Sequence, residues 1–178
     1  TMHLLEFVTG LKCKAVAADL TTFVLGRQLD DDASIMIRMG ENVKGNLSIS
    51  QIATGQENNL TISIYGEKGA LHWAQENPNY ARLSKVGRAD QIITRGGVIQ
   101  HPDSFGSIRI PPGHPEGYLE GFAQIYSDAA DVLLDHQNKN KLLELLPNGN
   151  TGLQIMKFIN ASVNSSKNNS AWTDLKSI

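Results

Sequence analysis

The sequence predicts an α+β fold, in which a large, mainly antiparallel sheet carries helices on one face and leaves the other face free. Several short segments alternate apolar and polar residues, as half-buried strands do. Glycine, asparagine and aspartate separate these segments by a few residues, which is typical of antiparallel hairpins. Two later segments repeat apolar residues every three or four positions, which indicates amphipathic helices. The 178 residues suit one domain, and we expect 1–178 to form it.

The first half of the chain contains the expected strands. A short helix over 3–9 precedes them, and Gly10 is suited to end it. Gly40-Glu41-Asn42 and Gly66-Glu67-Lys68-Gly69 are predicted hairpin turns. The expected strands cover 12–24, 34–39, 43–52, 60–64, 70–75, 80–84 and 90–94.

The second half contains a long loop and two helices. Residues 95–113 are interrupted by Gly and Pro and have no period, and a loop longer than about 15 residues is usually functional or mobile. We expect helices over 115–134 and 151–165. Glu116 would then complement the positive end of the first helix dipole. A Thr-x-x-Gln capping box at Thr151 would start the second.

The free face of the sheet is expected to be apolar, because several strands place apolar residues on both of their faces. A broad apolar face on a globular domain usually meets a partner.

Composition excludes several classes of partner and site. The 16 basic and 18 acidic residues give a net charge of −2, which is too weak to favour nucleic acid or an anionic membrane. No apolar run approaches the roughly 18 residues of a membrane span. Cys13 is the only cysteine, so an intramolecular disulfide is excluded and a cytoplasmic location is expected.

The sequence lacks the motifs of nucleotide, metal and nucleophile sites. No Gly-x-Gly-x-x-Gly or Walker loop is present to bind a pyrophosphate. No two histidines lie three or four residues apart, which makes a zinc site improbable. No Gly-x-Ser-x-Gly elbow is found. The triplet Asp30-Asp31-Asp32 lacks the spacing of a calcium loop, and we interpret it as a solvated turn.

His114 and Arg27 are the polar side chains best placed to bind a ligand. His114 follows Pro111-Pro112-Gly113 at the entrance of a predicted helix, where an imidazole can face a polar ligand. The alternative is that its side chain forms a local hydrogen bond that pins the loop. Arg27 either pairs with one of the nearby aspartates or binds a polar substrate.

A series of short motifs runs along the chain between about residues 3 and 175. They are His3-Leu4-Leu5-Glu6-Phe7-Val8-Thr9-Gly10, Ala18-Asp19-Leu20-Thr21-Thr22-Phe23 with Gly26-Arg27, Leu29-Asp30-Asp31-Asp32, Ser50-Gln51-Ile52-Ala53-Thr54-Gly55 with Glu57-Asn58, Tyr65-Gly66-Glu67-Lys68-Gly69 with Trp73, Gly113-His114-Pro115-Glu116-Gly117-Tyr118 with Phe122-Ala123 and Tyr126, Gly152-Leu153, Lys157-Phe158-Ile159 and Trp172. Together they resemble the C-terminal domain of the glucose-fructose oxidoreductase / inositol dehydrogenase / rhizopine catabolism (Gfo/Idh/MocA) family.

This resemblance implies a function that the residues alone do not. Proteins of this family bind NAD(P) on an N-terminal Rossmann domain, and their C-terminal domain supplies an antiparallel sheet and part of the substrate pocket. They commonly oxidise or reduce hydroxyls of sugars, inositols or related polyols. The expected parent is therefore an NAD(P)-dependent dehydrogenase whose Rossmann domain lies outside this chain. The fragment alone is expected to be inactive and to bind neither NAD nor NADP, and its sheet face is expected to form a homo-oligomer.

The resemblance also places the catalytic residues outside the chain. The family's Glu-Lys-Pro motif belongs to the N-terminal half, and Glu67-Lys68 is followed here by Gly69 in a hairpin. The family's Asp-x-x-x-His histidine lies ten residues before a Thr-Gly, and counting back from Gly10 leads to position zero. His3 lies one helical turn later on the same face. We therefore expect no catalytic, cofactor-binding or metal-binding residue here.

Four substrate contacts are expected: His114, His3, Arg27 and Gln51. A hydroxyl-rich substrate needs several hydrogen-bonding side chains, and these types supply them. Two alternatives remain open. The chain is a binding or scaffold domain without a cofactor, or it belongs to a non-redox member of the same superfamily, such as a hydrolase or a transcription regulator.

Overall fold

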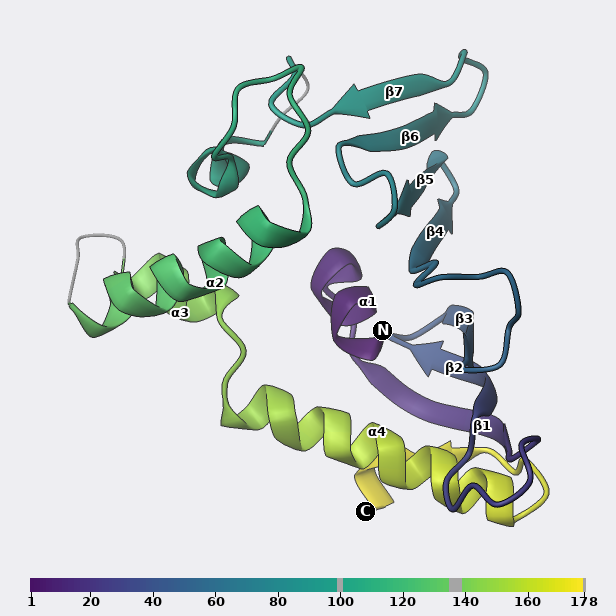
Figure 1. The fold of residues 1–178 in the computed structure, drawn as a ribbon. Coiled ribbons are helices and arrows are strands. Elements are labelled where there is room, and N and C mark those ends of the chain that lie inside the picture. The colour runs from purple at the N-terminus through teal and green to yellow at the C-terminus, as the bar shows by residue number, and fades with distance from the viewer. Residues whose placement is uncertain (99–100, 135–138, 178) are drawn as a thin grey trace. The chain divides into compact units, whose positions relative to one another are not determined.

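The computed structural model describes residues 1–98, 101–134 and 139–177. They divide into two compact units, which are described separately. Unit 1 comprises Thr1–Gln56 and Pro147–Ile178, and unit 2 comprises Glu57–Leu146. Figure 1 labels their helices and strands.

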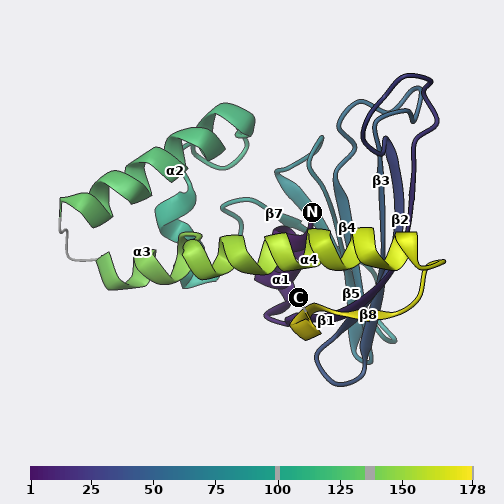
Figure 2. The ribbon, with the colours of Figure 1, turned by 90° about the horizontal axis from the view of Figure 1, so that it is seen from below.

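Unit 1 is a four-stranded antiparallel sheet with helices. The strand order is β3-β2-β1-β8, and α4 packs against β1 (Figures 1 and 2). The elements are α1 (Met2–Thr9), β1 (Cys13–Thr21), β2 (Asp32–Met39), β3 (Val43–Ser50), α4 (Gly149–Lys167), β8 (Thr173–Asp174) and the 3-10 helix η2 (Leu175–Ser177).

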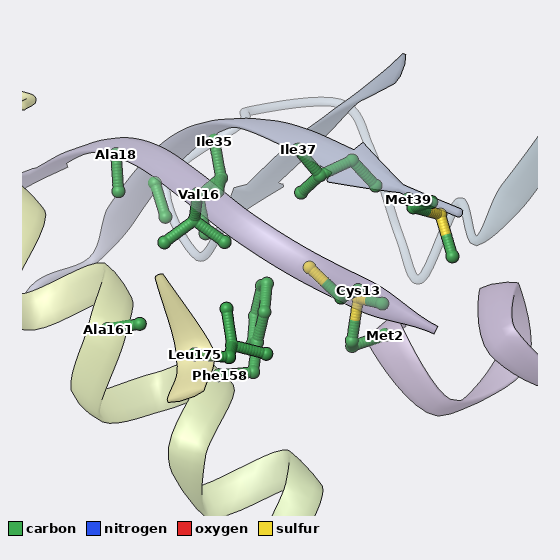
Figure 3. Packing of buried hydrophobic residues seen from close by; sticks show 11 residues of the cluster. Met2, Cys13, Val16, Ala18, Ile35, Ile37, Met39, Phe158, Ala161 and Leu175 are labelled. Carbon is green, nitrogen blue, oxygen red and sulfur yellow. The ribbon is translucent and has the colours of Figure 1, made fainter. Parts of the chain in front are cut away.

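Alternation along β2 builds the core of unit 1. Every second residue from Ala33 to Met39 is buried, and the residues between them face away. Phe158 and Ala161 of α4 and Leu175 of η2 cover the buried face (Figure 3). A strand with period-two burial cannot slip by one residue without exposing its whole apolar set, so this core fixes the register of β2.

The other edge of β1 is closed partly by serine side chains. β8 pairs with β1 only at Ala15 and Val16. Beyond that point the amides of Ala18 and Leu20 donate to the hydroxyls of Ser165 and Ser166 of α4, at 2.9 and 3.0 Å. These hydroxyls satisfy backbone groups that a neighbouring strand would otherwise have to satisfy.

Unit 2 contains a second four-stranded antiparallel sheet, in which the strands follow chain order. A side chain at Gly69 would collide with the carbonyl oxygen of Ser84, so the hairpin after Gly66 needs glycine there. The elements are β4 (Thr61–Gly66), β5 (Gly69–Ala74), β6 (Tyr80–Lys85), β7 (Gln91–Thr94), the 3-10 helix η1 (Pro102–Ser107), α2 (Tyr118–Leu133) and α3 (Lys139–Leu145).

One face of the second sheet is apolar. The strand register places seven apolar side chains on it, and they are Ile62, Ile64, Leu71, Trp73, Ala81, Leu83 and Ile93. All seven are partly buried, and no described hydrophobic residue of unit 2 reaches the burial of the unit 1 core. We call these seven residues the apolar face of unit 2.

The predicted fold class is confirmed: the chain is α+β with antiparallel strands. The strands form two four-stranded sheets instead of one large sheet. The prediction of apolar residues on both faces holds for β1, which places Ala15 and Ala17 opposite the core face. It is wrong for β2 and β3, which present Ser34, Arg38, Asn46 and Ser48 around Met36 on that face. The register explains this, because these residues alternate with the core-facing positions.

The helix boundaries also need correction. α4 begins at Gly149, and the side chain of Asn148 accepts hydrogen bonds from the amides of Asn150 and Thr151. The predicted capping box at Thr151 is therefore wrong, because Asn148 is the N-cap. α2 begins at Tyr118 rather than at residue 115, and α3 was not expected. The predicted loop over 95–113 contains η1.

Candidate functional site

The four expected substrate contacts are divided between the two units. His3, Arg27 and Gln51 lie in unit 1, whereas His114 lies in unit 2. All four residues are exposed.

Asp31 brings Arg27 and Gln51 to the same end of the unit 1 sheet. Its carboxylate accepts hydrogen bonds from the amides of Phe23 and Val24, at 2.8 and 3.0 Å, and pairs with Arg27 Nη1 at 3.3 Å. Its carbonyl oxygen accepts the amide hydrogen of Gln51 at 2.8 Å. Arg27 therefore pairs with an aspartate, and the loops after β1 and β3 are joined.

The interpretation of the acidic triplet as a solvated turn is wrong for Asp31. Its side chain is 1% exposed, because it points into the loop that it organises. The amide of Phe23, followed by that of Val24, holds the pKa of the Asp31 carboxyl below its ordinary value, while desolvation opposes this shift.

His3 lies at the other end of this sheet. Met2 packs beside Cys13 in the core (Figure 3), and the Glu6 carboxylate accepts the amide hydrogen of Cys13 at 3.0 Å. These contacts fix α1 at the start of β1, whereas Arg27 follows its end. A nine-residue strand spans roughly 30 Å. Within one copy, one monosaccharide cannot contact His3 and Arg27 together.

Two hydrogen bonds hold the backbone of His114 in place. Its amide donates to the carbonyl of Pro111 at 3.3 Å, and its own carbonyl accepts from Arg95 Nη2 at 2.7 Å. Gly113 has a φ of 88°, a conformation that favours glycine. Among the described residues, none forms a hydrogen bond with the imidazole, which is exposed. The imidazole does not pin the loop, so the alternative interpretation of His114 is not supported.

A buried polar network, not predicted from the sequence, holds this loop. Arg95 Nη1 and Glu116 Oε2 form an ion pair at 2.6 Å, with side chains that are 17% and 7% exposed. The side chain of Asn79 bridges them: its oxygen accepts from Arg95 Nε at 2.7 Å, and its nitrogen donates to the Glu116 carbonyl at 2.9 Å. The only signal in the sequence was the position of Glu116 inside the motif 113–118.

Glu116 does not complement the dipole of α2, contrary to expectation. It lies before the helix, and its carboxylate is used by Arg95. Glu120 takes the dipole position: its carboxylate accepts the amide hydrogen of Gly117 at 2.9 Å. This hydrogen bond is the first cause of a pKa of Glu120 below its ordinary value.

The other candidates do not form a metal site. His72 Nδ1 lies 2.8 Å from Ser63 Oγ across two strands, and His101 is exposed. His136 lies outside the described residues. In the described ranges no group of three or more His, Cys, Asp or Glu side chains could hold a metal ion. Within the same ranges no helix is long and apolar enough to cross a membrane.

A hollow of about 450 Å³ lies against the strands of unit 1. None of His3, Arg27 and Gln51 lines it. Its walls are made of Ala17, Ala18, Asp19, Ser34, Ile35, Met36, Asn46, Leu47, Ser48 and Ser170. We therefore assign the expected contacts to exposed surfaces and not to this hollow.

Known proteins resemble the chain over nearly its whole length. An oxidoreductase from Sinorhizobium meliloti is 43% identical, with a TM-score of 0.89, and the match covers 96% of this chain and 48% of that one. An inositol dehydrogenase homolog from Azotobacter vinelandii, solved with NADH and myo-inositol, has a TM-score of 0.86 over 97% of this chain and 47% of its own. At 24% identity, the latter likeness shows the fold alone.

A curated relative agrees with these structures. The oxidoreductase YfiI of Bacillus subtilis (strain 168) is 26% identical over 171 residues, which are 93% of this chain and 43% of YfiI. The chain thus spans about half the length of the relatives it matches. Residues 1–72 match the model of the GFO/IDH/MocA C-terminal domain. Residues 1–72 thus belong to the Gfo/Idh/MocA C-terminal domain family, and the rest of the chain shares the fold of the oxidoreductase from Sinorhizobium meliloti.

Proposed function

We propose that this chain is the substrate-binding and subunit-contact part of an NAD(P)-dependent dehydrogenase that acts on a sugar, an inositol or a related polyol. The observation that carries the proposal is its 43% identity to an oxidoreductase over 96% of the chain. In such a reaction the nicotinamide exchanges a hydride with the carbon that bears the hydroxyl.

Among the described residues, those at the starts of α2 and α4 do not fit the pyrophosphate of the cofactor. Such a group usually binds at the N-terminus of a helix behind a glycine-rich turn. At α2 the Gly117 amide already donates to the Glu120 carboxylate, whose charge would repel a phosphate. At α4 the amides of Asn150 and Thr151 are bound by Asn148. We therefore propose that NAD or NADP binds to a domain beyond these residues, and that the isolated chain is inactive.

The chain would contribute side chains that orient the substrate. His114 is the first candidate, because a neutral imidazole offers one donor and one acceptor to neighbouring hydroxyls and is exposed on a held loop. His3, exposed on α1, is the second. Arg27 and Gln51 form a separate group at the other end of unit 1, where they would contact a second part of a larger ligand or a second ligand.

The apolar face of unit 2 would form the contact with a second copy. Its seven side chains are only partly buried in one chain, and burial against an identical face would remove them from water. The single cysteine, Cys13, is buried in the core as a free thiol, and this suits the cytoplasmic location that we propose.

Two measurements test the proposal. Isothermal titration of the 178-residue chain with NADH and with NADPH should give no binding, and micromolar binding to either would contradict the assignment of the cofactor to another domain. In the full-length protein that contains this chain, nicotinamide reduction with myo-inositol and with glucose as probes should be measured for wild type and His114→Ala. We expect the variant to raise KM by about tenfold or more. No turnover with any polyol would favour a scaffold or non-redox role.

A further inference from the structure

We propose that Arg95 and Glu116 are positioning residues, which hold the loop over 109–117 so that the imidazole of His114 faces the substrate. This inference rests on the proposed role of His114. Arg95 is distant in sequence from the histidine, and Glu116 is buried close to it. Both would affect substrate binding without contacting the substrate.

The Glu116 carboxylate holds the start of the loop. It accepts the amide hydrogens of Arg109 at 3.0 Å and of Ile110 at 3.3 Å. Both oxygens are thus used, and Oε2 also pairs with Arg95. A buried carboxylate with these partners fixes the backbone six and seven residues before it, because each amide points at a defined oxygen.

Arg95 holds both sides of the turn that carries His114. Its Nη1 donates to the Ile110 carbonyl and its Nη2 to the His114 carbonyl, each at 2.7 Å. The turn residues 111–113 lie between these two acceptors. A guanidinium is planar and has donors in fixed directions, so one side chain sets the spacing of the two carbonyls.

Asn79 ties this pair to the sheet. Its side-chain oxygen accepts from Arg95 Nε and from the Glu116 amide, at 2.7 and 3.2 Å. The amide of Arg95 donates to the carbonyl of Asn79 at 2.9 Å. Arg95, which follows β7, and Asn79, which precedes β6, therefore both contact the loop.

A second contact holds the loop to α2. The Arg109 side chain donates to Gln124 at 3.1 Å and to Ser127 at 2.6 Å. The loop is thus attached at its start to α2, and at both sides of the turn to Arg95. Of the polar side chains of this loop, the imidazole of His114 is the one that is exposed and has no hydrogen-bond partner among the described residues, whereas the exposed Pro111, Pro112 and Pro115 carry no polar side-chain group.

The cost of burying this network argues for a role beyond stability. An ion pair taken out of water gains little over apolar packing of the same volume, whereas loss of one partner is strongly destabilising. Precise placement of a substrate contact is a reason to retain such a pair, since small displacements of positioning groups reduce the rate.

The test is a double-mutant cycle in the full-length protein, with myo-inositol and glucose as probes. The variants are Arg95→Lys, His114→Ala and the two together. Arg82→Lys is the matched control, because Arg82 also forms an ion pair in unit 2 but lies on the exposed surface, paired with Asp90 at 3.2 Å. KM and kcat are measured for each variant, together with the unfolding temperature.

If Arg95 acts through His114, Arg95→Lys raises KM several-fold in wild type and has no further effect on the His114→Ala background. Arg82→Lys leaves KM unchanged. Equal effects of Arg95→Lys on both backgrounds overturn the positioning role and leave the role of His114 intact. An unchanged KM in His114→Ala overturns the proposed role of His114, and with it this inference, whereas the absence of turnover would overturn the proposed function.

A variant that does not fold is replaced by a milder one. Glu116→Gln keeps the shape of the side chain but loses the charge opposite Arg95. Asn79→Asp replaces the donor to the Glu116 carbonyl with a second oxygen and adds a negative charge beside Arg95. Amide hydrogen exchange at Arg109 and Ile110 is then measured beside KM. Faster exchange with a raised KM supports positioning, and faster exchange with an unchanged KM overturns it.

Discussion

The hydroxyl of Ser165 accepts the amide hydrogen of Ala18 at 2.9 Å and donates its own hydrogen to the carbonyl of Ala171 at 2.7 Å. Both Ser165 and Ala18 have no exposed surface. One side chain therefore satisfies an edge of β1 and the turn that follows α4, and no water can replace it.

Ser165→Ala should destabilise the chain by about 1–3 kcal/mol, because it leaves a buried amide without a partner. Urea unfolding of the 178-residue chain measures this. Ser162→Ala is the control, since Ser162 is also buried but donates only within α4, to Phe158. Equal losses in both variants would show that the bond to Ala18 is not what matters.

Asp31→Asn should loosen the loop after β1 and weaken the pH dependence of stability. The folded pKa of Asp31 lies below its unfolded value, so its contribution is present above the unfolded pKa of about 4 and is lost as pH falls through the folded pKa. Unfolding midpoints between neutral and acidic pH measure this. Asp30→Asn is the control, because Asp30 is the exposed neighbour of Asp31. Identical pH profiles for the two variants would contradict the role of Asp31.

Cys13 should be unreactive in the folded chain at neutral pH. Burial first, and then the charge of Glu6, raises the pKa of its thiol to about 11. Because the thiolate is the reactive form, alkylation by iodoacetamide should rise only as pH approaches this value. Unfolded chain in urea is the reference, and a midpoint near the ordinary thiol pKa in folded protein would contradict the burial.

Ile93→Asp should weaken association of the full-length protein, because Ile93 belongs to the apolar face of unit 2. Sedimentation velocity of the wild type and the variant shows whether the proposed homo-oligomer is lost. Ile92→Asp is a close control, since Ile92 is the same residue type on the same strand but lies on the opposite face. Equal effects of both variants would contradict an interface on the apolar face.

The strands were largely predictable because their signals are local. Alternation in β2, the turn at Gly40 and the hairpin at Gly69 are each contained in a few residues. The division into two sheets was not predictable, since strand order depends on contacts between distant segments. α3 was missed because its seven residues are too few to show a clear helical period.

The candidate site was predictable only in part. The position of His114 before a helix and the presence of an aspartate near Arg27 could be seen in the sequence. The pairing of Arg95 with Glu116 could not, because 21 positions and a loop without period separate them. The burial of Asp31 could not be predicted either, because its carboxylate is held by the backbone amides of Phe23 and Val24, which any residue other than proline would supply.

The network around the His114 loop binds backbone carbonyl oxygens, which every residue provides, and backbone amide hydrogens, which every residue except proline provides. It therefore tolerates any side chain at Pro111 and any side chain other than proline at Ile110. Such a loop can exchange these side chains during divergence while its histidine keeps its place. Sequence drift within the turn would thus change the surface beside His114 on an unchanged scaffold.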